Sequence, residues 1–307
     1  MGQKIVTVFG GTGFIGRDVV RELAKAGYTV NVVSRNPELA KQLKVEGPVG
    51  KVVLTQGNIR DEGQIKSLVA NSYAVVNLIG ILYETSKQKF DSLQAKAAEN
   101  IAKACKEGNI KRLIHISALG VDKAVGSKYA RTKLNGEKAV LAVFPEANII
   151  RPGIVFGEDD NFFNKFARLA RISPVLPLIG GGYTKFQPVF VGDVAVGITK
   201  IMQNDDYKGQ IFEFGGPKTY SFKELLQIIL AEINLKRLLI PVPFALAAIK
   251  AFFLQLLPKP LLTVDQVKLL MHDNVVSGNY KGLKDLGIKP TYLETVIPYY
   301  LKKYKKK

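Results

Sequence analysis

The stretch Lys4–Gly16, KIVTVFGGTGFIG, determines how we interpret the rest of the chain. It predicts an apolar strand, three glycines at a spacing of three residues, and then an amphipathic helix. Gly10 suits a tight turn, Gly13 lets the main chain approach a pyrophosphate, and Gly16 lets the helix lie close to the strand. In this context the glycines predict a dinucleotide fingerprint with the phosphates at the helix N-terminus. The alternative is a purely structural turn.

Length and composition favour a globular α/β protein. The 307 residues suffice for one large domain or for a domain with an appended lobe. Apolar residues make up 47% of the chain, which supports a substantial core. The single cysteine, Cys105, cannot form an internal disulfide, and two histidines give no Cys/His metal cluster. We therefore expect a reducing compartment and no metal, and the first residues give no indication of a signal peptide.

The charge is strongly basic, with 44 Lys and Arg against 26 Asp and Glu, for a net charge of +18. A basic surface suits anionic ligands, an anionic membrane surface or an acidic partner. No helix-turn-helix or zinc module is visible, so we expect no nucleic-acid partner. The alternative is a basic surface that serves solubility alone.

Strand and helix patterns alternate as far as residue 150, which predicts a Rossmann-type, doubly wound parallel sheet of the α/β class. We expect an NAD(P)-binding domain over residues 1–152. Residues 153–307 are expected to form mostly a smaller, discontinuous C-terminal α/β lobe, with some segments returning to the sheet. The expected strands are 5–9, 29–33, 52–56, 74–79, 112–116 and 147–150, and the helices between them 62–70, 89–107 and 127–143.

The end of the second strand faces the adenosine ribose in such folds. NAD-specific sites usually place Asp or Glu there, whereas this chain has Ser34 and Arg35. An arginine can pair with a 2′-phosphate in fork geometry, so we expect NADP(H) to be preferred, with NAD(H) possible. The alternative is a surface arginine stacked on adenine. Asn58, after the third strand, could hydrogen-bond the adenine edge.

Tyr129 and Lys133 lie four residues apart in YARTK, on one face of a predicted helix. We expect the ammonium to lie near the phenol and to lower its pKa, so that the tyrosine can transfer a proton during hydride transfer. The fifth strand ends in Ser117, and Gly80 lies at the expected crevice. The alternative for the pair is a solvated helix face.

Several motifs together resemble the atypical and extended short-chain dehydrogenase/reductase superfamily: GGTGFIG, HISALG, YARTK, RPGIVFG and FVGDVA. The order NLIGILYET, KRLIHISALG, KYARTKLNGEKAV and FPEANIIRPGIVFGEDDNFFN is similar to the nucleotide-binding accessory subunit of respiratory complex I, NADH:ubiquinone oxidoreductase, and its bacterial relatives. The resemblance covers residues 4–235 and fades beyond them. It implies tightly held NADP(H), a peripheral position on the membrane complex and doubtful turnover.

The resemblance also implies site residues. A catalytic set of Ser117, Tyr129 and Lys133 matches, but Ala118 stands where active members often have a second hydroxyl, and Gln94 stands where they usually have Asn. The catalytic half is therefore expected to be vestigial. The expected dinucleotide contacts are Gly10, Thr12, Gly13, Phe14, Ile15, Gly16, Ser34, Arg35, Asn58, Ile59, Leu78, Gly80, Ser117, Tyr129, Lys133, Pro152 and Ile154.

The C-terminal half supplies further expectations. Asp61, Asp193 and Ser221 are expected to cap helices. The most apolar region predicts a helix over Phe244–Leu257, too short to span a bilayer, which could pack in the core, on a partner or on a membrane. The lysine-rich tail Tyr300–Lys307 is expected to be mobile and attracted to an anionic leaflet.

Three functions remain open at this point. The first is a non-catalytic homologue that holds NADP(H) structurally and attaches to the respiratory complex, peripheral to the cytoplasmic, inner face of a bacterial or inner mitochondrial-type membrane. The second is an active NADP(H)-dependent reductase or epimerase acting on a lipophilic, quinone-precursor-like substrate. The third is a sugar-nucleotide epimerase, which the departures at Ala118 and Gln94 make weaker.

Overall fold

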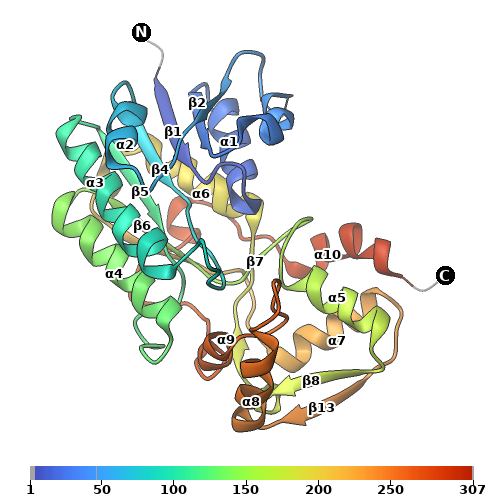
Figure 1. The fold of residues 1–307 in the computed structure, drawn as a ribbon. Coiled ribbons are helices and arrows are strands. Elements are labelled where there is room, and N and C mark those ends of the chain that lie inside the picture. Colours follow the sequence, from blue (N-terminus) through green and yellow to red (C-terminus); the bar gives the residue numbers. More distant parts are fainter. Residues whose placement is uncertain (1–3, 46, 306–307) are drawn as a thin grey trace.

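The computed structural model describes residues 4–45 and 47–305. Its centre is a parallel seven-stranded sheet with the order β11-β6-β5-β4-β1-β2-β3 (Figure 1). The direction of winding reverses between β1 and β4, which leaves a crevice at their carboxyl ends. This confirms the predicted Rossmann-type α/β fold. The strands are β1 Ile5–Phe9, β2 Thr29–Ser34, β3 Val52–Gln56, β4 Ala74–Asn77, β5 Arg112–Ile116, β6 Asn148–Pro152 and β11 Ile211–Phe214.

Helices cover both faces of this sheet (Figure 1). On one face, α1 Phe14–Lys25 and α6 Val191–Gln203 pack together against buried valines of β1 and β2. On the other face lie α2 Glu62–Val69, α3 Ala97–Glu107 and α4 Lys128–Val143. Because both faces are covered, the central strands are mostly apolar, as β4 shows, where all four residues are buried and only Asn77 is polar.

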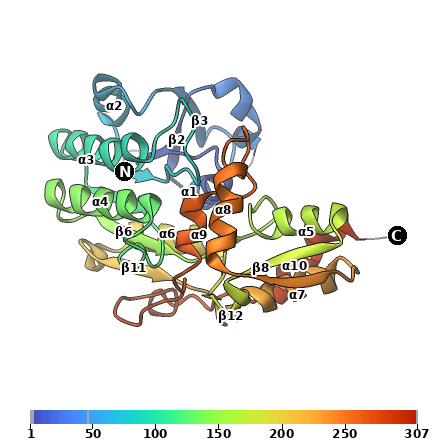
Figure 2. The same cartoon turned by 60° about the horizontal axis from the view of Figure 1, so that its bottom comes forward.

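A second core belongs to the C-terminal part of the chain, where Phe163, Phe222 and Ile297 are buried together. The main elements of this part are α5 Phe163–Ile172, β8 Val175–Ile179, α7 Phe222–Glu232, β13 Leu238–Val242, α8 Phe244–Leu254, α9 Val264–Leu269 and α10 Leu293–Leu301 (Figure 2). Helices α8 and α9 pack on Ile179 in a small cluster of their own. Two short pairs complete it, β7 Val155–Phe156 with β10 Val189–Phe190, and β9 Lys185–Phe186 with β12 Tyr220–Ser221.

Three features of the structure differ from the predicted elements. The helix expected over 89–107 begins with a π-helix, Asp91–Lys96, before α3. The strand pair β8 and β13 was not predicted, because prolines at Pro177 and Pro241 obscure the strand pattern. Helix α8 ends at Leu254, earlier than expected.

The capping predictions are correct at two positions and wrong at one. Asp61 accepts a hydrogen bond from Gln64 N at 3.1 Å, and Ser221 forms a capping box. Asp193 caps nothing, because α6 starts two residues earlier, directly after β10. Its carboxylate instead accepts hydrogen bonds from the backbone and side chain of Thr291, at 2.6 and 3.0 Å.

The prediction of a mobile tail is wrong for its described part. Tyr300 is buried and donates its hydroxyl hydrogen to Asp160 Oδ2 at 2.7 Å. Tyr304 donates to Asn164 Oδ1 at 3.2 Å, within a short 3-10 helix. The aromatic side chains therefore anchor the segment to Asp160, just before α5, and to Asn164 within α5, while residues 306–307 lie outside the described part. No helix in residues 4–45 and 47–305 is long and apolar enough to cross a membrane.

Candidate dinucleotide-binding site

The glycine loop between β1 and α1 is strained against a side chain at Gly10 and has no room for one at Gly16. Gly10 has φ +83°, and a Cβ on it would lie 3.1 Å from the Leu78 carbonyl carbon. A Cβ on Gly16 would lie 2.2 Å from the Gly10 carbonyl oxygen, a distance that atoms cannot share. Gly13 is the residue before α1, and no side chain caps the helix there. The N-terminus of α1 thus presents backbone N–H groups at the crevice, as a phosphate site requires.

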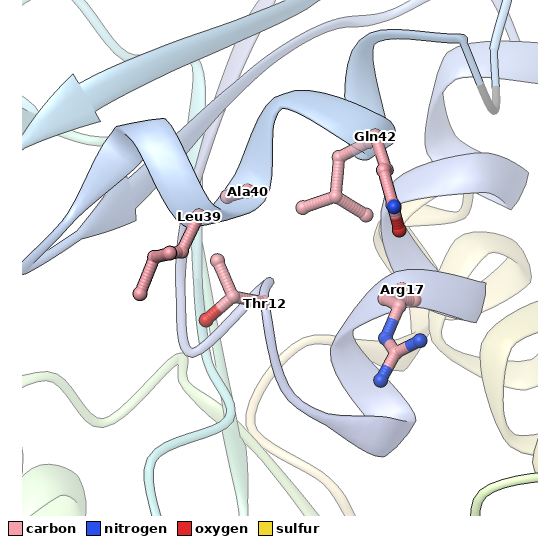
Figure 3. Close-up of a pocket in the computed structure, with 6 residues that line it drawn as sticks. Thr12, Arg17, Leu39, Ala40 and Gln42 are labelled. Carbon is pink, nitrogen blue, oxygen red and sulfur yellow. The ribbon is translucent and has the colours of Figure 1, made fainter.

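A pocket of about 160 Å³ adjoins this loop. Figure 3 shows Thr12 of the loop and Arg17 of α1 facing Leu39 and Gln42 of the 3-10 helix Pro37–Val45. The sequence analysis did not predict that the 3-10 helix would line this pocket, because its residues form no recognisable motif. A larger pocket of about 410 Å³, lined by Phe14 and Tyr299 among others, lies on the other side of Arg17.

The expected adenosine contacts follow β2 and β3. Ser34 ends β2, and its Oγ accepts a hydrogen bond from Asn36 N at 3.2 Å. Arg35 is exposed beside it. Asn58 follows β3, and its side-chain oxygen accepts from Arg60 N at 3.1 Å. Its amide nitrogen makes no hydrogen bond among the described residues and could meet a ligand, while Ile59 packs against the core.

Lys133 lies at the carboxyl ends of β4 and β5. Its ammonium donates to the carbonyls of Ile79 at 3.2 Å and Ile116 at 3.0 Å. A Cβ on Gly80 would lie 3.3 Å from this nitrogen. Burial lowers the pKa of Lys133 to about 8. The lysine is therefore placed at the expected crevice, but its hydrogen bonds go to the main chain.

The expected lowering of the Tyr129 pKa is not found. Burial, together with the negative charge of Asp265, raises the pKa of Tyr129 to about 12. Asp265 accepts hydrogen bonds from the backbone N–H groups of Lys128 at 2.6 Å and of Tyr129 at 3.0 Å, and so holds the start of α4. The sequence analysis missed Asp265, because it lies 136 residues from Tyr129 in the chain.

The buried ammonium of Lys133 predicts a specific pH dependence of stability. Between about 8 and the ordinary value of 10.5, the folded state binds fewer protons at this lysine than the unfolded state. The free energy of unfolding should therefore rise with pH in this window, by up to about 3 kcal/mol from this group. Denaturant unfolding of Lys133→Met should lack this rise. Parallel pH profiles of the two proteins would contradict the assignment.

Two further polar side chains are buried beside Lys133. Ser117 Oγ is buried and has no hydrogen-bond partner among the described residues. His115 contacts Asn77 through Nδ1 at 3.1 Å, and its Nε2 likewise lacks a partner in the described part of the chain. Burial and the nearby Lys133 lower the pKa of His115 to about 3, so the imidazole is neutral. The sequence analysis gave His115 no role in the site.

Gln94, at the position where active members usually have Asn, is fully engaged in the fold. Its amide nitrogen donates to the Ile81 carbonyl at 2.9 Å, and its oxygen accepts from Thr132 Oγ1 at 2.9 Å. The backbone of α4 also lies close to that of the π-helix, since a Cβ on Gly136 would be 2.2 Å from the Gln94 carbonyl oxygen. Gln94, in the π-helix Asp91–Lys96, thus connects α4 to the loop after β4.

The segment expected at the nicotinamide end follows β6. Pro152 closes this strand, and Ile154 is half-buried just after it. Asn274 fixes this turn, since its side chain accepts from Ile154 N at 3.1 Å and donates to the Leu119 carbonyl at 3.0 Å. Within the described residues, no three His, Cys, Asp or Glu side chains are grouped so that they could hold a metal ion.

A doubly wound sheet, a glycine loop at its switch point and a Tyr-x-x-x-Lys pair at the same edge define a dinucleotide-binding protein of the short-chain dehydrogenase/reductase class. A family model described as NAD(P)H-binding matches residues 10–151.

Similar proteins specify the family further. NADH dehydrogenase [ubiquinone] 1 alpha subcomplex subunit 9, mitochondrial, of Arabidopsis thaliana is 38% identical over 98% of this chain and 78% of its own length. The NADH-ubiquinone oxidoreductase 40 kDa subunit, mitochondrial, of Neurospora crassa is 33% identical over 99% of this chain and 80% of its own length. The chain belongs to the NAD(P)H-binding family that contains these subunits.

The fold is shared more widely. The crystal structure of Citrobacter sp. triphenylmethane reductase complexed with NADP(H) superposes with a TM-score of 0.76 at 17% identity, covering 96% of this chain and 99% of that one. At this identity the likeness supports the fold alone.

Proposed function

We propose that the protein holds a dinucleotide, preferentially NADP(H), as a structural cofactor within a membrane-associated respiratory NADH dehydrogenase. The observation that carries the cofactor assignment is the glycine loop, in which Gly10 has a positive φ, Gly16 has no room for a side chain and no side chain caps α1. Main-chain N–H groups at Phe14–Gly16 would hold the pyrophosphate, while the Gly13 N–H closes the turn on the Gly10 carbonyl at 3.0 Å. When bound, a nicotinamide supplies hydride transfer chemistry.

The hydrogen bonds of Lys133 and Gln94 and the raised pKa of Tyr129 favour a structural role for the cofactor. Lys133 holds two main-chain carbonyls, and both ends of the Gln94 amide are used within the fold. A tyrosine with a pKa of about 12 gives up its proton poorly at neutral pH. The alternative, an active reductase or epimerase, is supported by Ser117, whose buried hydroxyl has no partner in the described structure and could meet a substrate oxygen.

Arg35 provides the test of cofactor preference. It is exposed at the end of β2, with no carboxylate at the position that would bind a ribose 2′-hydroxyl. Arg35→Ala should reduce the preference for NADP(H) over NAD(H) by about 1–3 kcal/mol, the range for a charge-assisted hydrogen bond. Titration calorimetry with both dinucleotides measures this. Arg168→Ala, an exposed arginine on α5, is the matched control. Equal affinities in the unchanged protein would reject the preference.

The substitution Tyr129→Phe distinguishes a structural cofactor site from a catalytic one. Its hydroxyl has no hydrogen bond among the described residues, so Tyr129→Phe should leave dinucleotide affinity and thermal stability almost unchanged. Tyr300→Phe is the control, because loss of its bond to Asp160 should cost about 1–2 kcal/mol. If added carbonyls or quinones oxidise bound NADPH in the unchanged protein and not in Tyr129→Phe, the enzyme hypothesis is correct.

The proposed attachment rests on the relatives, which are named as subunits of mitochondrial NADH dehydrogenases. A net charge of +18 suits contact with an anionic membrane surface on the inner, cytoplasmic-type side. Purification from native membranes in mild detergent tests this part. We expect other NADH dehydrogenase subunits to co-migrate with the chain, and a chain that migrates alone would argue against attachment.

A further inference from the structure

Helix α8 buries small side chains and exposes large apolar ones, the opposite of an ordinary surface helix. Its buried residues are alanines, Ala247 and Ala251. Four of its six large apolar side chains are more than half exposed, namely Leu246, Ile249, Phe252 and Phe253, while Phe244 and Leu254 are half-buried. A helix that only completes a core buries its large side chains and exposes polar ones. This exposed face therefore requires an explanation outside the chain's own core.

The apolar surface continues on both sides of the helix. Leu256 and Leu257 follow α8 and are exposed, and β13 leads into it with Leu238 and Ile240 exposed. We call Leu246, Ile249, Phe252, Phe253, Leu256 and Leu257 the α8 face. Figure 1 shows α8 at the lower end of the molecule, away from α1 and the glycine loop. The α8 face thus lies apart from the expected phosphate site.

Charge indicates what kind of partner the α8 face suits. Between Glu232 and Asp265 the chain contains no acidic residue. The charged residues of this stretch are all basic: Lys236, Arg237, Lys250 and Lys259. Lys236, Lys250 and Lys259 are exposed beside the apolar side chains. Bulky apolar side chains accompanied only by cations are typical of helices that lie in the interface of an anionic bilayer.

We propose that the α8 face inserts into the headgroup region of an anionic lipid leaflet, with α8 parallel to the membrane. This deepens the membrane part of the proposed function and rests on it for its cellular setting. The helix has 11 residues, about 16 Å at 1.5 Å per residue, so it can lie in the interface but cannot span the hydrocarbon core. Apolar insertion and the attraction of the lysines add to give stable peripheral binding.

Vesicle flotation of the purified full chain tests the proposal. The vesicles are phosphatidylcholine with and without phosphatidylglycerol. The chain should float with the anionic vesicles and much less with the neutral ones. Ile249→Ser with Phe253→Ser should lower the partition coefficient by about tenfold or more. Ile172→Ser, an exposed apolar side chain on α5, is the matched control and should change nothing. Lys250→Gln with Lys259→Gln should weaken binding most at low salt.

Unchanged flotation of the Ile249→Ser, Phe253→Ser variant would overturn the proposal. So would absence of flotation in the unchanged protein combined with loss of co-migrating NADH dehydrogenase subunits in this variant, because the α8 face would then be a protein interface. That second result would leave the proposed attachment to the respiratory enzyme intact. Circular dichroism of each variant is compared with that of the unchanged protein and should match it, because these side chains are exposed.

Discussion

Gly16→Ala is expected to weaken dinucleotide binding by about a hundredfold, which corresponds to about 2–3 kcal/mol of overpacking. The new Cβ would lie 2.2 Å from the Gly10 carbonyl oxygen and 2.6 Å from the Gly11 Cα. Both neighbours are backbone atoms, so the loop itself must move away from α1. Such a shift would turn the N–H groups at the start of the helix away from a phosphate.

Titration calorimetry with NADPH measures this loss. Gly63→Ala is the matched control, because Gly63 lies in α2 with ordinary backbone angles, and its Cβ would have only an ordinary contact at 3.4 Å. That control should bind normally and unfold at the same or a slightly higher temperature. Circular dichroism of Gly16→Ala without nucleotide separates lost binding from lost folding. Normal affinity in a folded Gly16→Ala protein would refute the assignment of the loop.

Glu137→Ala is expected to lower the free energy of unfolding by about 3–5 kcal/mol, the range for breaking a buried ion pair. Arg151 donates from Nε to Glu137 Oε1 at 3.0 Å and from Nη2 to Oε2 at 2.6 Å. The two side chains are only 5% and 3% exposed. Asp122 Oδ2 and Glu213 Oε1 lie 3.6 and 3.9 Å from Arg151 Nη1. Neither replaces a bidentate partner, so the substitution leaves a buried cation poorly paired.

Urea unfolding measures this change. Glu99→Gln, in the exposed pair with Lys103 at 2.6 Å, is the matched control and should cost less than about 1 kcal/mol. The double substitution Glu137→Leu with Arg151→Met should recover most of the loss, because it removes both charges together. A loss of stability no greater than that of the surface control would show that this pair does not secure α4 against β6.

Local sequence patterns were enough to predict the core of the fold. The strands around the crevice and the helices that follow them depend on apolar periodicity and on turn glycines, which are read within short windows. For the same reason Gly10, Gly16, Asp61 and Ser221 could be assigned from their immediate neighbours. The residues expected at the carboxyl ends of the strands could be predicted from the parallel topology, because each of them lies directly after a strand.

Features that depend on distant segments could not be predicted in this way. Asp265 reaches the start of α4 from α9, and this contact governs the charge environment of Tyr129. Tyr300 is anchored by Asp160, which lies 140 residues away, so its lysine-rich surroundings gave the wrong expectation of mobility. The exposure of α8 was likewise undetermined, because an apolar helix has the same sequence signature in a core and on a surface.

The most direct test of the account is the identity of the nucleotide that the protein retains. The chain is purified from native membranes without added nucleotide, and its bound small molecules are released by denaturation and identified by mass spectrometry. We predict NADP(H) in stoichiometric amount, retained through purification and not consumed when carbonyl or quinone compounds are added. Recovery of no dinucleotide, or of NAD(H) alone, or consumption of the bound NADPH would contradict the proposal of a structural NADP(H) site.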